Sequence, residues 1–581
     1  MTPKSAAHTV FATPELALAI SAYLTQHDLT QCARVCKDWM QLNEPILYRA
    51  FCPFEPLGGS TPSPQTAGGL IRNLPHIRTV ELYPTEHDAV HSHTVMQELA
   101  HGLPQCTQAG DSALDPDTLC TNLQHFKFRC GSNDDMLPAL PHLITLLNHN
   151  HFLTRLMIPL TYSSLDTGSF AAVSRLRHLR SLAVFTDINI SCEGRRPISL
   201  FLQACLPLPE LSELDMDLYV GGEDEVNDQG IPDFDTIIEE ATIARFSGNS
   251  SACKIKSLLF PRCSDSGSLP LARSLLVSDL VDLESLTVPE LHSNSDALHL
   301  EQVIRERCTH LKHLTCSVFY ELGSAQFVRA VIRGCSGLKS FTSLFGFADE
   351  DNNYEPRLLI LDLVERHCNT LEEITLECCH QVYSADLQAV LTRCKQLKRL
   401  WVQSAFLIGR AGIEFTDLSM SDWVCTELRV LGLTLNRYPN GEDSDLDEED
   451  PGLMALDGER FYRQIGQLGK LEELALDIDR SEETMTKESD YAWDLTLSRG
   501  WLGELAKLKS LKRLRLNADF WSKMGQADVE FMHEQWPLLN EISLQGQVSD
   551  ERTQAHWQWL FDQRPRLLFT TTLRSSSPYE I

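Results

Sequence analysis

The amino-acid sequence predicts an α/β solenoid, with a curved parallel sheet inside and helices outside, preceded by a small all-α module. Two observations predict the solenoid. The pattern Leu-x-x-Leu-x-Leu recurs along most of the chain, and helix-forming stretches precede several of its copies. Each unit is then a strand, a turn and a helix, which cannot bury its apolar face alone. Stacking of such units buries a continuous core.

The all-α module is predicted near the start of the chain. Thr13 is a suitable N-cap and Pro14 suits the first helical position. Leu16, Ile20 and Leu24 recur every four residues and form one apolar stripe of this first helix. A second helix is capped by Asp28, and its inner side is made of Leu29, Cys32, Val35, Cys36 and Trp39. A third helix begins at Pro45 and includes Ile46, Leu47 and Tyr48.

Three short helices make a core that is too small to be stable alone. An apolar face docked on a partner would solve this problem. An ordinary helical cap for the solenoid is the alternative interpretation.

The stretch from Phe11 to Phe51 resembles the F-box, the motif by which adaptor proteins bind the Skp subunit of cullin-based ubiquitin ligases. Pro14 directly precedes Glu15, where the family usually has one intervening residue. The resemblance is carried by Pro14-Glu15-Leu16, Ile20, Tyr23-Leu24, Asp28-Leu29, Val35-Cys36-Lys37, Trp39 and the Pro45 to Tyr48 end. It implies that the Skp contact is made or supported by Pro14, Leu16, Ile20, Leu24, Leu29, Val35, Trp39 and Leu47.

Composition indicates a large protein without a membrane or secretory segment. The chain has 581 residues, of which 43% are hydrophobic, and no apolar run approaches the roughly 20 residues of a membrane span. Because no secretory signal is visible, the 18 cysteines are expected to be reduced thiols in cytoplasm or nucleus. The formal charge of −30 argues against general nucleic-acid binding, which needs a basic surface.

The predicted organisation has five parts. We expect a disordered N-terminus at 1–10, the F-box-like helical domain at 11–52, a Pro/Gly/Ser linker at 53–70, the repeat solenoid at 71–574 and a flexible tail at 575–581. Acidic insertions interrupt the solenoid near 221–235 and 440–452. A solvated loop is the first interpretation of both, and contact with a basic partner is the second.

The sequence contains eleven clear copies of the repeat pattern, and each copy predicts one strand. Three pairs of neighbouring starting positions, beginning with Leu283 and Leu311 and ending with Leu539 and Leu567, are separated by 28 residues, within the period of leucine-rich repeats. The clear copies begin at Leu123, Leu179, Leu211, Leu283, Leu311, Leu371, Leu397, Leu428, Leu471, Leu511 and Leu539; weaker ones begin at Ile77, Leu153, Ile255, Leu338 and Leu567.

Cysteines support the same register. Cys120, Cys308, Cys335, Cys368, Cys394 and Cys425 each stand three residues before the first leucine of a copy. A small buried thiol suits the end of a helix that packs beneath a strand. Helices are expected upstream of four of them, at His299–Arg307, Ala325–Arg333, Leu358–Arg366 and Ala385–Arg393. This region resembles the cysteine-containing leucine-rich repeats often found behind an F-box, although the Asn/Cys position of that family is well matched only by Cys263, Cys379 and Asn436.

Candidate chemistry is sparse. Cys378, Cys379 and His380 have no second Cys/His pair at zinc-finger spacing, so we expect no metal site. The sequence contains no Walker loop, no Gly-x-Ser-x-Gly and no His-Glu-x-x-His. We therefore expect neither catalysis nor a cofactor.

The inner face of the sheet is the predicted target-binding surface. Residues that flank the fourth and sixth positions of the pattern face outward from the helices, because side chains alternate along a strand. Trp401, between Arg399 and Gln403, is the sharpest candidate for an interface anchor; a polar face exposed to water is the plainer interpretation. The candidates are Lys127, Arg129, Asp215, Asp217, Glu373, Arg399, Trp401, Gln403, Arg513 and Arg515.

These features predict a non-catalytic substrate receptor of a Skp-cullin-F-box ubiquitin ligase, acting as a monomer within that complex. The alternative is a repeat scaffold unconnected with ubiquitination, whose N-terminal helices only cap the solenoid. The sequence does not identify the target protein.

Overall fold

A computed structural model describes the repeat strands and many of the helices between them. The chain divides into two compact units, unit 1 (Met1–Leu283) and unit 2 (Glu284–Ile581). The described residues are 50–51, 77–82, 96–97, 99–100, 122–128, 140–159, 171–186, 205, 208–218, 255–259, 283–288, 309–318, 322–345, 356–377, 382, 384–403, 413, 415–435, 451–478, 495–545 and 551–572.

Unit 1 contains a parallel sheet in which each strand pairs with the next one along the chain. Helix α7 (Leu140–His149) lies between two of these strands in the sequence. The strands are β1 (Ala50–Phe51), β2 (Thr79–Leu82), β3 (His125–Phe128), β4 (Arg155–Pro159), β5 (Ser181–Thr186), β6 (Glu213–Leu218) and β7 (Ser257–Leu259).

The first strand lies earlier than the sequence predicts. Ala50 and Phe51 fall inside the segment assigned to the helical module, yet they pair in parallel with Thr79 and Val80 of β2. The end of the segment assigned to the helical module thus also contributes a short strand to the sheet. Two residues are too short for any periodic pattern, so only pairing identifies this strand.

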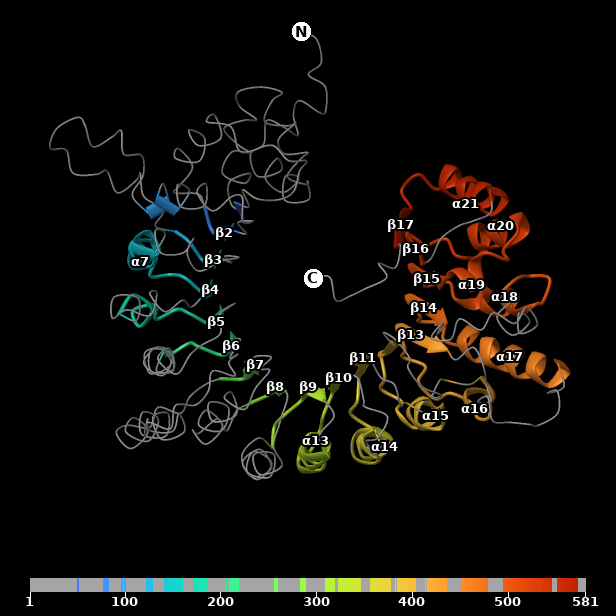
Figure 1. Ribbon diagram of the computed structural model, residues 1–581, viewed down its shortest axis with the longest axis horizontal. Coiled ribbons are helices and arrows are strands. Elements are labelled where there is room, and N and C mark those ends of the chain that lie inside the picture. The colour runs from blue at the N-terminus through green and yellow to red at the C-terminus, as the bar shows by residue number, and fades with distance from the viewer. Residues whose placement is uncertain are drawn as a thin grey trace, which may run out of the picture. The chain divides into compact units, whose positions relative to one another are not determined.

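Unit 2 contains a longer parallel sheet with helices along one side of it (Figure 1). Its strands are β8 (Ser285–Val288), β9 (His313–Val318), β10 (Ser340–Phe345), β11 (Glu373–Glu377), β12 (Arg399–Gln403), β13 (Val430–Leu435), β14 (Glu473–Ile478), β15 (Arg513–Asn517), β16 (Glu541–Gln545) and β17 (Leu568–Thr572). Its helices are α13 (Leu322–Gly334), α14 (Pro356–His367), α15 (Ser384–Arg393), α16 (Phe415–Ser419), α17 (Pro451–Gly466), α18 (Trp501–Glu504), η4 (Leu505–Lys507), α19 (Ala518–Trp521), α20 (Gln526–Gln535) and α21 (Glu551–Gln563).

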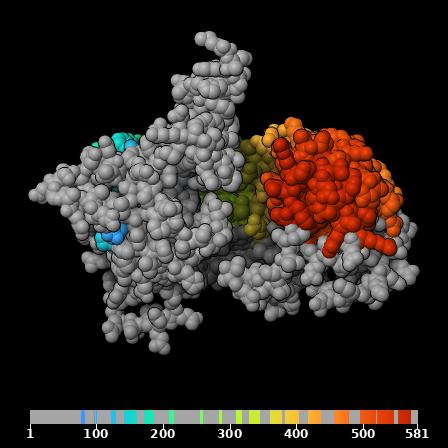
Figure 2. Space-filling model, turned by 90° about the horizontal axis from the view of Figure 1, so that it is seen from above, coloured from blue at the N-terminus to red at the C-terminus, as the bar shows by residue number. Residues whose placement is uncertain are grey.

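The repeating leucines explain this arrangement. In the repeats before the last one, the described leucine positions are buried against the helices; Leu397, which precedes β12, and Leu400 and Val402 on it are at most 4% exposed. Three predicted helices are present as α13, α14 and α15, while His299–Arg307 lies outside the described residues. Parallel strands that alternate with helices confirm an α/β leucine-rich-repeat solenoid. The C-terminal repeats of unit 2, in orange and red, pack into one continuous body (Figure 2).

The last repeat is shifted by one residue relative to the prediction. Ile542 of β16 pairs with Phe569, so the period here is 27 residues and the final copy begins at Arg566 rather than at Leu567. The consequence is visible in burial, since Phe569 occupies the core row but is 41% exposed. Among the described residues, no strand pairs with the other side of β17.

The cysteines that precede the repeats pack as predicted. Cys335, Cys394 and Cys425 are buried, and Cys368 is half-buried. Burial raises the pKa of Cys394 and of Cys425 to about 12. Both thiols are therefore protonated near neutral pH and contribute packing. Cys120, Cys308 and the Cys378–His380 group lie outside the described residues.

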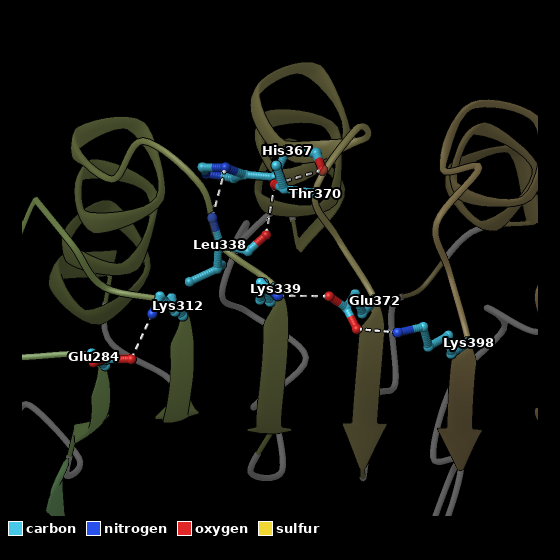
Figure 3. Close-up of polar contacts among 8 residues, drawn as sticks. All are labelled: Glu284, Lys312, Leu338, Lys339, His367, Thr370, Glu372 and Lys398. Carbon is cyan, nitrogen blue, oxygen red and sulfur yellow. Dashed lines mark hydrogen bonds and ion pairs between the residues drawn. The ribbon is translucent and has the colours of Figure 1, made fainter. Parts of the chain in front are cut away.

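Ion pairs connect neighbouring repeats just before their strands. Lys312 lies 2.6 Å from Glu284, and Glu372 accepts from Lys339 at 2.9 Å and from Lys398 at 2.5 Å (Figure 3). Hydrogen bonds from these two lysines lower the pKa of Glu372 to about 2. Because the side chains are partly exposed, we expect these pairs to fix register more than to add stability.

A buried histidine joins two repeats through backbone groups. His367, at the end of α14, accepts a hydrogen bond from the Leu338 N–H on Nδ1 at 3.3 Å and contacts the Ile332 carbonyl through Nε2 at 2.8 Å (Figure 3). Such a ring is neutral, with its proton on Nε2. Asn150 does the same in unit 1, where it accepts from the Leu123 N–H and donates to the Leu146 carbonyl. Each side chain satisfies the N–H of the first leucine of the preceding repeat.

We predict that His367 makes the stability of unit 2 depend on pH. Burial lowers its pKa from the ordinary value of 6.5, so below that pH the unfolded chain binds a proton that the folded chain excludes. The contribution of His367 to the unfolding free energy should therefore be constant above pH 6.5 and fall below it, by at most about 1.4 kcal/mol per pH unit. Urea denaturation between pH 7 and pH 5 measures this slope.

The matched variant is His367→Asn, which has the bridging groups of Asn150 but no titrating ring. Its slope below pH 6.5 should be shallower than that of the parent protein by up to one proton. Equal slopes in the two proteins would show that His367 is not the group responsible.

Candidate functional site

The predicted site residues fall into two groups. Arg129 and the eight docking residues from Pro14 to Leu47 lie outside the described residues. Asp217 and Gln403 belong to β6 and β12, but their side chains are not among those described. In unit 1, Lys127 lies on β3 and Asp215 on β6, with two strands between them. The remaining candidates lie in unit 2.

In unit 2 the strand register aligns the candidates in two rows on the inner face. The first row contains Glu373, Arg399, Val430, Glu473, Arg513 and Glu541. The second row contains Thr375, Trp401, Gly432, Ala475, Arg515 and Ser543. The side chains of both rows lie on the face of the sheet opposite to the buried leucines, because successive side chains of a strand alternate between its two faces. The predicted face is therefore a real surface of the fold.

Trp401 lies flat across the neighbouring strand. A Cβ atom added to Gly432 would lie 2.7 Å and 2.8 Å from Cδ2 and Cζ3 of the indole, which shows that the ring covers this glycine. Trp401 is half-buried for this reason. The glycine is thus required for space beneath the ring.

Two guanidinium groups flank the indole. The Arg399 guanidinium carbon lies 5.3 Å from the ring centroid and that of Arg515 lies 5.4 Å from it. Arg515 is three strands away from Trp401, which is about 14 Å between backbones. It can reach the ring because Gly432 and Ala475 between them leave the row open. Both contacts are in the range of cation–π interactions.

A buried carboxylate orders the arginines. The Glu473 side chain is 4% exposed and pairs with both Arg513 and Arg515, the second at 3.3 Å. In the third row, Asn517 donates to Asp477 on the adjacent strand. The two ion pairs of Glu473 hold Arg513 and Arg515 in place, and a carboxylate left without them at this depth would be costly.

We name the Trp401 site as the set Arg399, Trp401, Glu473, Arg513 and Arg515. The sequence analysis predicts four of these, Arg399, Trp401, Arg513 and Arg515, as members of the target-binding face. It does not reveal that Gly432 supports the indole, or that Glu473 joins two arginines. A glycine between two core leucines of β13 is the signal for the former, since such a position is otherwise occupied by a side chain on the inner face.

Metal and membrane functions gain no support from the described part of the chain. No group of three or more His, Cys, Asp or Glu side chains there could hold a metal ion. Within the same ranges, no helix combines the length and the apolar character needed to cross a bilayer. The Trp401 site contains aromatic, cationic and carboxylate groups, which is a composition typical of recognition.

Comparison with known proteins supports the assignment of the N-terminal segment. Residues 14–53 match the F-box-like family model. No curated protein matches the chain.

Solved structures show distant likeness. The Rad7–Elc1 complex in yeast matches with 14% identity over 83% of this chain and 93% of that chain, with a TM-score of 0.38. The leucine-rich-repeat-containing protein LegL7 from Legionella pneumophila matches with 9% identity, 84% and 98% coverage, and a TM-score of 0.24. The TLR13–ssRNA13 complex matches with 12% identity, 73% and 50% coverage, and a TM-score of 0.35. The chain therefore combines an F-box-like segment at residues 14–53 with a leucine-rich-repeat solenoid.

Proposed function

We propose that this protein is the substrate-recognition adaptor of a Skp-cullin-F-box ubiquitin ligase. The observation that supports the proposal is the F-box-like segment at residues 14–53, placed ahead of a solenoid. The segment would dock on an Skp-type subunit, and the inner face of the repeats would hold a target protein. The adaptor would have no catalytic residue and would work in the cytoplasm or nucleus, as a monomer within the complex.

The mechanism would be proximity. A target lysine held near the conjugating enzyme reacts as if its concentration were strongly raised. A rigid solenoid suits this role, because each repeat is fixed to its neighbours by a continuous ladder of strand hydrogen bonds. The target would then be held on a rigid surface of unit 2.

Binding to a purified Skp adaptor tests the proposal. We expect a complex at micromolar concentration, measured by isothermal titration calorimetry with the full chain. The double variant Leu16→Asp with Trp39→Ala should weaken it by about a hundredfold or more, since apolar and aromatic anchors dominate such interfaces. Met420→Asp is the matched control, because Met420 at the end of α16 is 68% exposed and outside the docking segment. Absence of a complex, or equal binding by the double variant, would contradict the proposal.

A second function is favoured by one observation. Ala50 and Phe51, the end of the matched segment, add a strand to the first repeat, which is what a helical cap of the solenoid would do. A scaffold of this kind would lose the stability of its first repeats when residues 1–49 are removed. The adaptor would keep a folded solenoid after that truncation and lose only the Skp complex. Limited proteolysis of the truncated chain distinguishes the two, because truncation at residue 49 leaves β1 in place.

A further inference from the structure

We propose that the Trp401 site binds an acidic, unmodified peptide segment of the target, with a side-chain carboxylate on Arg399 and Arg515 and an adjacent apolar side chain on the indole. This inference rests on the proposed function for the identity of the partner as a ubiquitination target. It adds the chemical class of that target.

The charge of the site is the first reason to expect an acidic ligand. Three guanidiniums, from Arg399, Arg513 and Arg515, lie in the same two rows as the carboxylates of Glu373, Glu473 and Glu541. The Glu473 carboxylate is buried beneath its two arginines, so a ligand would meet guanidinium nitrogens before it met this oxygen. Arg399 is thus the cation of the site that pairs with no carboxylate among the described residues, on a chain whose formal charge is −30. Distant charges are screened over about 8 Å at physiological salt, so the local arginines decide what binds.

The open edge of the Arg399 guanidinium is the second reason to expect an anionic ligand. Within the described residues no carboxylate lies within ion-pair distance of it, although Glu373 is its in-register neighbour on β11. Its guanidinium contacts the Trp401 ring instead. A guanidinium has five N–H donors in a fixed fork that matches a carboxylate, and stacking on a ring leaves the edge of that fork open. Arg399 is thus preorganised to receive an anion.

The charges around Arg399 favour a carboxylate over a phosphate group. Arg513 and Arg515 pair with Glu473, which leaves the Arg399 guanidinium as the group that a single incoming carboxylate can neutralise. Glu373 and Glu541 border the site on the two outer strands, in register with Arg399 and Arg513. A doubly charged phosphate would meet repulsion from both borders, since like charges at close range disfavour binding. The geometry therefore favours Asp or Glu side chains.

The rigid indole of Trp401 is the reason to expect an apolar side chain beside the acidic one. Trp401 is held flat by Gly432 and two guanidiniums, so little conformational entropy remains to be lost on binding. A rigid indole beside arginines is the composition of an interface hot spot. An apolar side chain next to the acidic one would bury the exposed part of the ring.

Peptide binding by the full chain tests the inference. The probes are three fluorescein-labelled peptide pools with uncharged degenerate flanks and a fixed centre of Asp-Leu-Asp, Asn-Leu-Asn or phosphoserine-Leu-phosphoserine. Fluorescence anisotropy should show binding of the Asp pool, with the Asn pool weaker by about tenfold, because charge-assisted hydrogen bonds are lost. The phosphoserine pool should also bind more weakly than the Asp pool.

Variants then locate the binding. Arg399→Gln should weaken the Asp pool by about tenfold, whereas Arg393→Gln, which removes an exposed arginine from α15, should leave it unchanged. Gly432→Ala should weaken it as well, because the new methyl group displaces the indole without removing any charged group. Its control is Gly337→Ala, where nothing lies within 4 Å of the added atom. Thermal melts establish that each variant is folded.

Several results would overturn the inference. They are equal binding of the Asp and Asn pools, tighter binding of the phosphoserine pool, no binding of any pool at millimolar protein, or an Arg399→Gln variant that binds like Arg393→Gln. The outcome is separable from the proposed function, since the Leu16→Asp, Trp39→Ala variant should bind the Asp pool normally. Absence of Skp binding by the parent protein, with intact peptide binding, would contradict the adaptor proposal alone. Skp binding by the parent protein without peptide binding would contradict only this inference.

Discussion

Gly466→Ala is expected to destabilise unit 2 by about 3 kcal/mol or more, because the new methyl group has no space. Gly466 is the last residue of α17, and a Cβ atom there would lie 3.0 Å from the carbonyl carbon of Glu504 and closer still to its oxygen. The obstacle is backbone at the junction of α18 and η4, which cannot rotate away as a side chain would. The loss should exceed the small gain in helix propensity that alanine brings, at most about 1 kcal/mol.

Urea denaturation followed by tryptophan fluorescence measures this effect. Gly469→Ala is the matched control, since it lies three residues further along the chain and no atom is within 4 Å of its added Cβ. We expect the control to unfold like the parent protein. If the two variants unfold at the same urea concentration, the close approach of α17 to Glu504 does not exist in solution.

The periodic parts of this fold could be predicted from sequence. Leu371, Ile374 and Leu376 illustrate why, since one face of a strand must be apolar wherever helices cover it, and all three are buried. The helices α13 to α15 followed from the same rule at a period of 3.6 residues. The predicted start at Leu567 failed because a one-residue shortening between α21 and β17 moves every side chain of the strand to the other face.

The contacts that make the candidate site could not be predicted, because they depend on which residues become neighbours across strands. Trp401 and Arg515 are more than a hundred residues apart in sequence and meet only through the register of four strands. His367 is similar: its position suggests a cation at a helix end, but burial and the Leu338 N–H make it a neutral bridge. Sequence therefore identified the face, and packing determined its chemistry.

Trp536→Ala is expected to cost about 4 kcal/mol, the range found for removal of large buried aromatic side chains. Trp536 caps α20 and is fully buried, and its indole N–H donates to the Leu505 carbonyl at 3.1 Å. The alanine variant loses the packing and one of the two donors to this carbonyl, which also accepts from the Leu508 N–H. Trp536→Phe keeps an aromatic ring and loses the bond, so it should cost about 1–3 kcal/mol. Urea denaturation of the full chain should rank the parent protein first, Phe second and Ala last.

The two large effects should be coupled, because both act on one turn. Gly466 approaches the Glu504 carbonyl from the preceding repeat, and Trp536 binds the adjacent Leu505 carbonyl from the following one. A turn already displaced by the Gly466→Ala methyl group can no longer offer its carbonyl to the indole at the same distance. The double variant should therefore lose less stability than the two single variants together, by about 0.5–3 kcal/mol. Strict additivity in this double-mutant cycle would mean that α18 and η4 do not transmit contacts between neighbouring repeats.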